Sequence, residues 1–142
     1  MYRQQNKLVY NGIDGLSHIN KWIQDRLNKE AIQFADGFGW ALSHGEGGKK
    51  KLSSAQIRNI FGEVKKLQMK GWDDSTESSL LLLKAKLQYS AKRAGGMAFH
   101  LKDIISRGID AVVESDNQHK SLDNFADFFE AILAYHRGYG GD

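Results

Sequence analysis

Residues 80–93, LLLLKAKLQYSAKR, are the stretch that decides the fold. Apolar residues recur in it every three or four positions, which is the spacing of one face of an α-helix. That face consists of Leu80, Leu83, Leu87 and Ala91. Residues 128–137, FFEAILAYHR, have the same form, an apolar helix that ends in a tyrosine and basic residues. The two segments together predict a helical protein.

On the N-terminal side, apolar residues keep helical spacing from Leu16 to Ala41, and Gly45 is placed to end the helix there. We therefore expect one long N-terminal helix. Residues 45–51, GEGGKKK, have neither a period nor apolar content. They predict a mobile loop, over residues 45–52, that ends in three positive charges.

Capping signals mark the helices that follow. Residues 53–56, SSAQ, have the form of a capping box and predict a helix over about residues 54–69. Asp74 or Ser75 can cap the next helix, which carries the leucines and extends to Lys92.

Two more helices are expected near the C-terminus. Gly95 and Gly96 break the chain before a helix whose apolar residues run from Phe99 to Val112. Ser121 can cap the last helix, and the glycine-rich residues 138–142 are expected to be flexible.

Composition sets the fold class. A chain of 142 residues, 41% of them hydrophobic, fits one domain with a real core. It contains no proline, whereas ordinary proteins contain about 5%, and this favours helices joined by glycine-containing turns. We predict an all-α fold in which residues 1–142 form a single compact bundle of about five helices. Residues 1–13 are expected to be flexible.

The composition also bounds the compartment and the chemistry. Without cysteine there is no disulfide, no thiolate nucleophile and no cysteine-based metal site, which fits a reducing compartment. The first residues, MYRQQNK, lack the apolar core of a signal peptide, and four consecutive leucines are far too short for a membrane span. We expect a cytoplasmic protein with no cofactor and no membrane partner.

The formal charge of +3 is distributed unevenly. Residues 49–93 carry eleven Lys and Arg against four acidic residues, a net charge of +7, which leaves −4 for the remainder. One face should be basic and another acidic. Such polarity suits a protein that binds a polyanion on one side and a protein on the other, although an ordinary solvated surface would explain it too.

The predicted helix over residues 54–69 carries Arg58, Lys65 and Lys66 on one arc, together with Gly62. A glycine inside a helix costs up to about 1 kcal/mol relative to alanine, so its presence suggests a close approach to the backbone. The arc is either a basic ridge that contacts a polyanion or a lysine-rich solvated face.

In the following helix, Lys86, Ser90 and Arg93 share an arc beside Tyr89. Basic side chains with an interleaved aromatic residue can hold phosphates and stack a base, as in single-strand binding. Tyr89 is either such a platform or a core residue whose hydroxyl reaches the surface.

Nothing in the sequence indicates catalysis. The five histidines show no pair on one helix face that could hold a metal ion, so we expect no metal site. His136 stands beside Arg137 and could act as acid or base on a phosphate, but no catalytic partner is visible. The Gly45–Gly48 cluster follows a helix instead of a strand and is a weak signal for nucleotide binding.

With residues 53–58, SSAQIR, upstream, the two helical segments resemble the small subunit of the Csm-type (type III-A) CRISPR interference complex. The similarity extends over about residues 52–141. It implies a helical, non-catalytic subunit that stacks with copies of itself beside the guide-binding backbone subunits and the Cas10-type subunit. It also implies a role in antiviral defence, with guide and target RNA as partners.

Eight basic residues are expected on the RNA face. The resemblance implies that Arg58, Lys86 and Arg93 face RNA. From the charge distribution we add Lys49, Lys50, Lys51, Lys65 and Lys66. Their contacts are expected with phosphate and sugar, because base pairing to the guide already supplies sequence recognition.

Two alternatives remain open at this point. One is a free-standing, metal-independent ribonuclease that uses His136 or His100 as its acid or base. The other is a DNA-binding regulator whose recognition helix is the one over residues 54–69.

Overall fold

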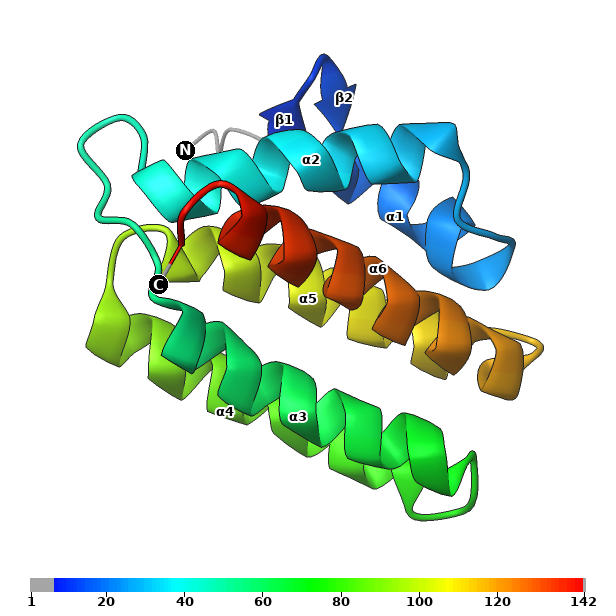
Figure 1. The fold of residues 1–142 in the computed structure, drawn as a ribbon. Coiled ribbons are helices and arrows are strands. Elements are labelled where there is room, and N and C mark those ends of the chain that lie inside the picture. The colour runs from blue at the N-terminus through cyan, green and yellow to red at the C-terminus, as the bar shows by residue number, and fades with distance from the viewer. Residues whose placement is uncertain (1–6, 142) are drawn as a thin grey trace, which may run out of the picture.

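The computed structural model describes residues 7–141, which are mostly helical (Figure 1). Six helices lie in this part of the chain: α1 (Gly15–Gln24), α2 (Lys29–His44), α3 (Ser54–Lys70), α4 (Thr76–Ala94), α5 (Ala98–Val113) and α6 (Gln118–Gly138). A small hairpin of β1 (Val9–Tyr10) and β2 (Ile13–Asp14) precedes them. The all-α expectation is confirmed in its main point, but the helices number six, not about five.

The difference arises at the N-terminus, where the single long helix that we expected is two. α1 ends at Gln24, and Asn124 of α6 donates from Nδ2 to the freed carbonyl of Ile23 at 3.0 Å. Asn28 then caps α2, since its side chain accepts from the backbone N–H of Ala31 at 3.0 Å. The apolar period continued through the break because both helices turn their apolar faces to the same core.

The hairpin occupies part of the segment that we expected to be flexible. β1 and β2 pair antiparallel across Asn11 and Gly12, whose φ angles of 53° and 75° suit a tight turn. Tyr10 and Ile13 are buried, so the hairpin belongs to the core. Residues 1–6 of the expected flexible segment lie outside the described residues.

The helices form three layers, which Figure 1 shows edge on. α5 and α6 make the middle layer; α1 and α2 cover one side of it, and α3 and α4 cover the other. α6 packs against α1, α2, α3 and α5, and so forms the centre of the molecule. Its Phe128 contacts the rings of Phe34 and Trp22, with centroids 6.2 and 5.7 Å apart. Within the described residues, no helix is long and apolar enough to cross a membrane.

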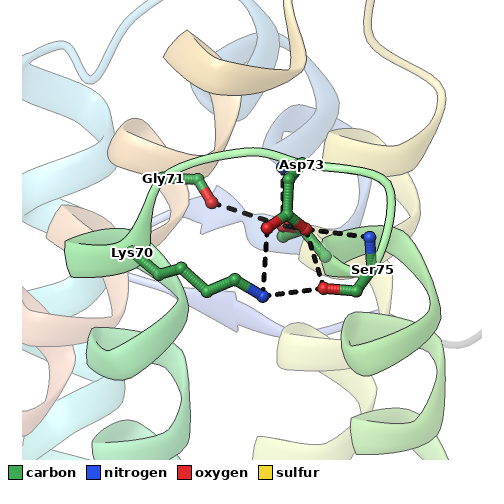
Figure 2. A network of polar contacts seen from close by, with 5 residues as sticks. Lys70, Gly71, Asp73 and Ser75 are labelled. Carbon is green, nitrogen blue, oxygen red and sulfur yellow. Dashed lines mark hydrogen bonds and ion pairs between the residues drawn. The ribbon is translucent and has the colours of Figure 1, made fainter.

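α3 and α4 form a helical hairpin with polar devices at its start and its turn. The expected capping box is present at the start of α3, where Gln56 Oε1 accepts from the Ser53 N–H at 3.4 Å. In the turn, the Asp73 carboxylate accepts from the Ser75 N–H at 2.8 Å and pairs with Lys70 Nζ at 3.2 Å (Figure 2). The hydrogen bonds from Ser75 and the charge of Lys70 hold the pKa of Asp73 well below its usual range.

The start of α6 differs from the expected one. Asn117 is the cap, because its side chain accepts from the Lys120 N–H at 3.1 Å. Ser121 lies one turn inside the helix, is fully buried, and donates from Oγ to Ser115 Oγ at 2.6 Å. The cap prediction failed because the true cap stands four residues earlier in a polar segment that already had turn character.

Residues 45–53 contain no helix, and their ends are held by the bundle. The Leu52 N–H donates to the carbonyl of Leu42 at 2.8 Å, and the Leu52 side chain is buried. The Met97 N–H donates to the carbonyl of Lys50 at 2.9 Å. The loop is therefore tied to the turn between α4 and α5.

Candidate nucleic-acid interface

Two hollows lie along the outer layer of the molecule, between α3 and α4, and the one toward the start of α3 has a volume of about 320 Å³. Toward the α3–α4 turn lies the other, a hollow of about 220 Å³. The hollow is lined by Glu63, Lys66, Leu67, Ser79, Leu82, Leu83 and Lys86. Polar positions three or four apart on each helix produce this lining, since such positions share one helix face. We call the two hollows together the α3–α4 furrow.

Lys66 and Lys86 reach this hollow from opposite walls. Lys86 Nζ lies 2.8 Å from Glu63 Oε1, so this predicted RNA contact is partly neutralised by an ion pair across the furrow. Lys66 is exposed, and within the described residues no carboxylate lies within 4.0 Å of its ammonium group. Lys66 therefore carries the free positive charge at this end.

The other end of the α3–α4 furrow combines an aromatic ring with a guanidinium group. It is lined by Gln56, Asn59, Ile60, Tyr89, Ser90 and Arg93. Tyr89 is 64% exposed. The alternative interpretation, in which Tyr89 is a core residue, is therefore wrong. The Arg93 guanidinium lies 5.8 Å from the centre of the Tyr89 ring, within range of a cation–π contact.

The structure separates the arc that the sequence predicted on α3. Lys65 points toward α6, with Nζ 2.9 Å from Gln68 Oε1 and 3.8 Å from Glu130 Oε1. Arg58 lies two turns before Lys65, on the same side of α3, and is exposed. Only Lys66 of the arc faces the furrow. The basic residues of α3 thus form two rows on either side of Gly62.

The three loop lysines lie at the Arg93 end of the furrow. Lys49, Lys50 and Lys51 are exposed, and a Cβ atom added to Gly96 would meet the Lys50 carbonyl oxygen at 2.5 Å. Gly96 stands two residues after the end of α4, so this contact brings the loop backbone at Lys50 beside the turn between α4 and α5. Arg93 stands in the last turn of α4. The fold therefore gathers charges from distant parts of the sequence at one end of the furrow.

The histidines that could act as acid or base do not lie in the furrow. His136 is fully buried, and its Nε2 lies 2.8 Å from the carbonyl oxygen of Leu52. His100 is half-buried, and burial and the neighbouring charge of Lys49 lower its pKa. In the described part of the chain, no group of three or more metal-ligating side chains could hold an ion.

α6 presents acidic side chains beside the Lys65 side of α3. Asp123 accepts from Gln68 Nε2 at 3.1 Å, and Glu130 pairs with Lys65. Burial and the neighbouring Glu130 and Asp123 carboxylates raise the pKa of the Asp127 carboxyl. This row of acids balances Lys65, whereas Arg58, farther along the same side of α3, is in no ion pair within the described residues.

Residues 27–142 match the family model of Csm2, type III-A. The chain belongs to the Csm2 family. Csm2 is the small subunit of the type III-A CRISPR complex, so the resemblance seen in the sequence is confirmed. The match includes α2 to α6 and all eight predicted contact residues. Among curated proteins, none matches the sequence.

The sequence did not reveal every residue of the furrow in this Csm2 chain. Gln56 and Asn59 line it beside Tyr89 and were not predicted. A signal for them exists, because Gln56, Asn59, Glu63 and Lys66 follow one another at steps of three or four residues. The ion pair between Glu63 and Lys86 had no such signal, since it depends on how two helices lie against each other.

Proposed function

We propose that this Csm2 chain is a non-catalytic RNA-binding subunit of the type III-A effector complex. Its partners are the guide and target RNA, the backbone and Cas10-type subunits, and further copies of itself. Its place of action is the cytoplasm. The single observation that supports RNA binding best is the α3–α4 furrow, where the free cations Lys66 and Arg93 flank the exposed ring of Tyr89.

The chemistry of the furrow suits a nucleic-acid backbone. Ammonium and guanidinium groups bind phosphate oxygens, and this binding releases counterions whatever the base sequence. An exposed tyrosine can stack on an unpaired base without selecting it. Phosphate contacts are what a subunit needs when the guide supplies sequence recognition by base pairing.

Two observations count against the ribonuclease alternative. A general acid or base must come within about 3 Å of the proton it moves, and fully buried His136 has no such access. His100, whose charged neighbours are Lys49, Glu46 and Asp103, lines neither hollow of the furrow. Incubation of the pure protein with labelled RNA in EDTA tests this alternative, since cleavage that disappears on His100→Ala or His136→Ala would support it.

The DNA-binding alternative requires one helix that projects into the major groove. The free cations near α3 are instead shared with α4 across a furrow, which suits a single strand better than a duplex. Competition between duplex DNA and single-stranded RNA for the protein tests the alternative directly. Preference for the duplex would favour it.

The decisive experiment is charge reversal in the furrow. Lys66→Glu with Arg93→Glu should weaken single-stranded RNA binding by about tenfold or more, because a hydrogen bond to a charged group contributes roughly 1.5–3 kcal/mol. The slope of log affinity against log salt concentration should fall by about 0.7 for each lost contact, with no change in sequence preference. The measurement is RNA affinity across a salt series, with helicity checked by circular dichroism.

Two further double variants control for net charge, which changes equally in all three. Lys29→Glu with Lys120→Glu places acids in the first turns of α2 and α6, where the helix dipole favours them, and should leave the affinity high. Arg58→Glu with Lys65→Glu tests the other side of α3. Equal losses in all three variants would mean that only net charge matters and that the furrow is a solvated face.

A further inference from the structure

Another hollow lies on the opposite side of the bundle, where the hairpin and the C-terminal end of α6 meet α2. Its volume is about 450 Å³. It is lined by Val9, Tyr10, Asn11, Asp36, Gly37, Trp40, Ala41, Glu46 and Tyr139. We call it the α2 hollow. None of its lining residues is basic, and none belongs to the α3–α4 furrow.

Large aromatic and apolar side chains stand open to solvent in the α2 hollow. Trp40 is 48% exposed, Val9 50% and Tyr139 40%. A tryptophan in a helix rich in apolar residues usually packs in the core, but Trp40 lies on the outward face of α2. The Trp40 ring is held in place by stacking on His44, with centroids 4.3 Å apart and planes 11° apart. The hollow therefore offers a fixed aromatic face.

Two carboxylates flank that face, and each is held by a phenol. The Tyr139 hydroxyl donates to Asp36, and the Tyr10 hydroxyl donates to Glu46. A carboxylate that accepts one hydrogen bond keeps its charge and further lone pairs for another donor. The combination of an indole face and two acids suits a Lys or Arg side chain, which contacts the ring by a cation–π interaction and the acids by charge-assisted hydrogen bonds.

We propose that the α2 hollow binds a Lys- or Arg-bearing segment of another kind of subunit in the same particle. This inference rests on the membership of the effector complex proposed above. The carboxylates repel an RNA backbone, so a protein is the occupant. A second copy of this chain also carries exposed lysines outside the furrow and loop, such as Lys29 and Lys120, so a second copy is kept as an outcome of the test.

The first test uses a cationic peptide and the indole N–H signals of labelled protein. Acetyl-Gly-Arg-Gly-amide should shift the Trp40 signal in a saturable way and leave that of fully buried Trp22 in place. Trp40→Phe assigns the signal, and acetyl-Gly-Glu-Gly-amide is the matched control. Asp36→Asn with Glu46→Gln should abolish the shift while still accepting the two tyrosine hydrogen bonds. Absence of a shift from the arginine peptide, or an equal shift from the glutamate peptide, overturns the proposal.

The second test uses the assembled particle. Asp36→Asn with Trp40→Ala should reduce recovery of this chain with the co-expressed subunits and guide RNA by about tenfold or more, while the free protein binds RNA as the wild type does. Lys66→Glu with Arg93→Glu should show the reverse pattern in RNA affinity, so failure of one idea is distinguishable from failure of the other. Full recovery of the Trp40 variant in the particle overturns the proposal.

Two other outcomes would also overturn it. If sedimentation shows that the free protein associates with itself and Trp40→Ala abolishes this, the occupant is a second copy. If deletion of residues 1–6 by itself moves the Trp40 signal and the arginine peptide then moves it back, the occupant is the chain's own N-terminal segment.

Discussion

The stability of the fold depends on whether the hydroxyl of Tyr10 is protonated. Its side chain is 9% exposed, its ring contacts Phe34 and Phe38 at centroid distances of 5.7 and 5.1 Å, and its hydroxyl donates to Glu46. Burial, followed by the hydrogen bond and the charge of Glu46, raises the pKa of Tyr10 above its ordinary value of 10.0. The folded state therefore favours the protonated phenol. This contribution to stability is complete below the unfolded pKa and is lost as the pH rises from there toward the raised pKa.

Tyr10→Phe should therefore change both the stability and its dependence on pH. At about pH 7 the free energy of unfolding should fall by about 1 kcal/mol, the usual contribution of one hydrogen bond. Between about pH 9 and 11 the variant should lose less stability than the wild type, because the group that must stay protonated is gone. Urea denaturation at several pH values measures both effects. Tyr89→Phe, at an exposed position, is the matched control, and identical pH profiles for Tyr10→Phe and the wild type would contradict the assignment.

The burial of single residues could be predicted only in part. Trp22 and Trp40 both occur in helical sequence rich in apolar residues, a context that favours burial of both. Trp22 is fully buried, whereas Trp40 shares the outward side of α2 with Asp36, one turn earlier, and Ile32, two turns earlier. The phase of that helix distinguishes the two tryptophans. Because we predicted one continuous helix through residues 25–28, we did not know which residues of α2 face outward.

At the scale of one element, Gly62 separates the two basic rows of α3. A Cβ atom added there would meet no atom within 4 Å, and Gly62 has no positive φ angle to protect. Gly62→Ala should therefore raise the free energy of unfolding by about 0.5–1 kcal/mol, the difference in helix propensity. Denaturation measures this directly, and a loss of stability would show that the site is not open.

The same variant reports on the path of the RNA. If the strand follows the α3–α4 furrow, Gly62→Ala leaves RNA affinity unchanged, since Gly62 does not line the furrow. Lower affinity together with higher stability would place the strand against the Arg58 side of α3 instead.

Helix ends were predictable where the signal was local. The capping box before α3 and the glycine breaks after α3 and α4 gave bounds close to those observed. We did not predict the break between α1 and α2, because the side chain that binds a carbonyl at the end of α1 is that of Asn124, which is distant in the sequence. Likewise, the sequence shows which basic residues α3 and α4 carry, but it does not show how they pair. Ion pairs such as Glu63 with Lys86 form only when helices meet.

At the scale of the whole molecule, α6 joins the three layers. Phe128 is fully buried between α1 and α2, so Phe128→Ala should lower the free energy of unfolding by about 3–5 kcal/mol. Far-ultraviolet circular dichroism and tryptophan fluorescence should shift together, because loss of the central packing affects all layers at once. Leu81→Ala, on the exposed side of α4, should change stability by only about 0.5 kcal/mol. If the unfolding midpoints from circular dichroism and from fluorescence differed, the layers would unfold independently.

The central position of α6 also has a meaning for synthesis. A ribosome makes α6 after the other five helices, and the four that pack against it, α1, α2, α3 and α5, gain this neighbour only when residues 118–138 have emerged. Until then the apolar surfaces that α6 covers in the folded protein are exposed, and exposed apolar surface invites aggregation. We therefore expect the nascent chain to be most prone to aggregation, and most in need of chaperones, before α6 has emerged.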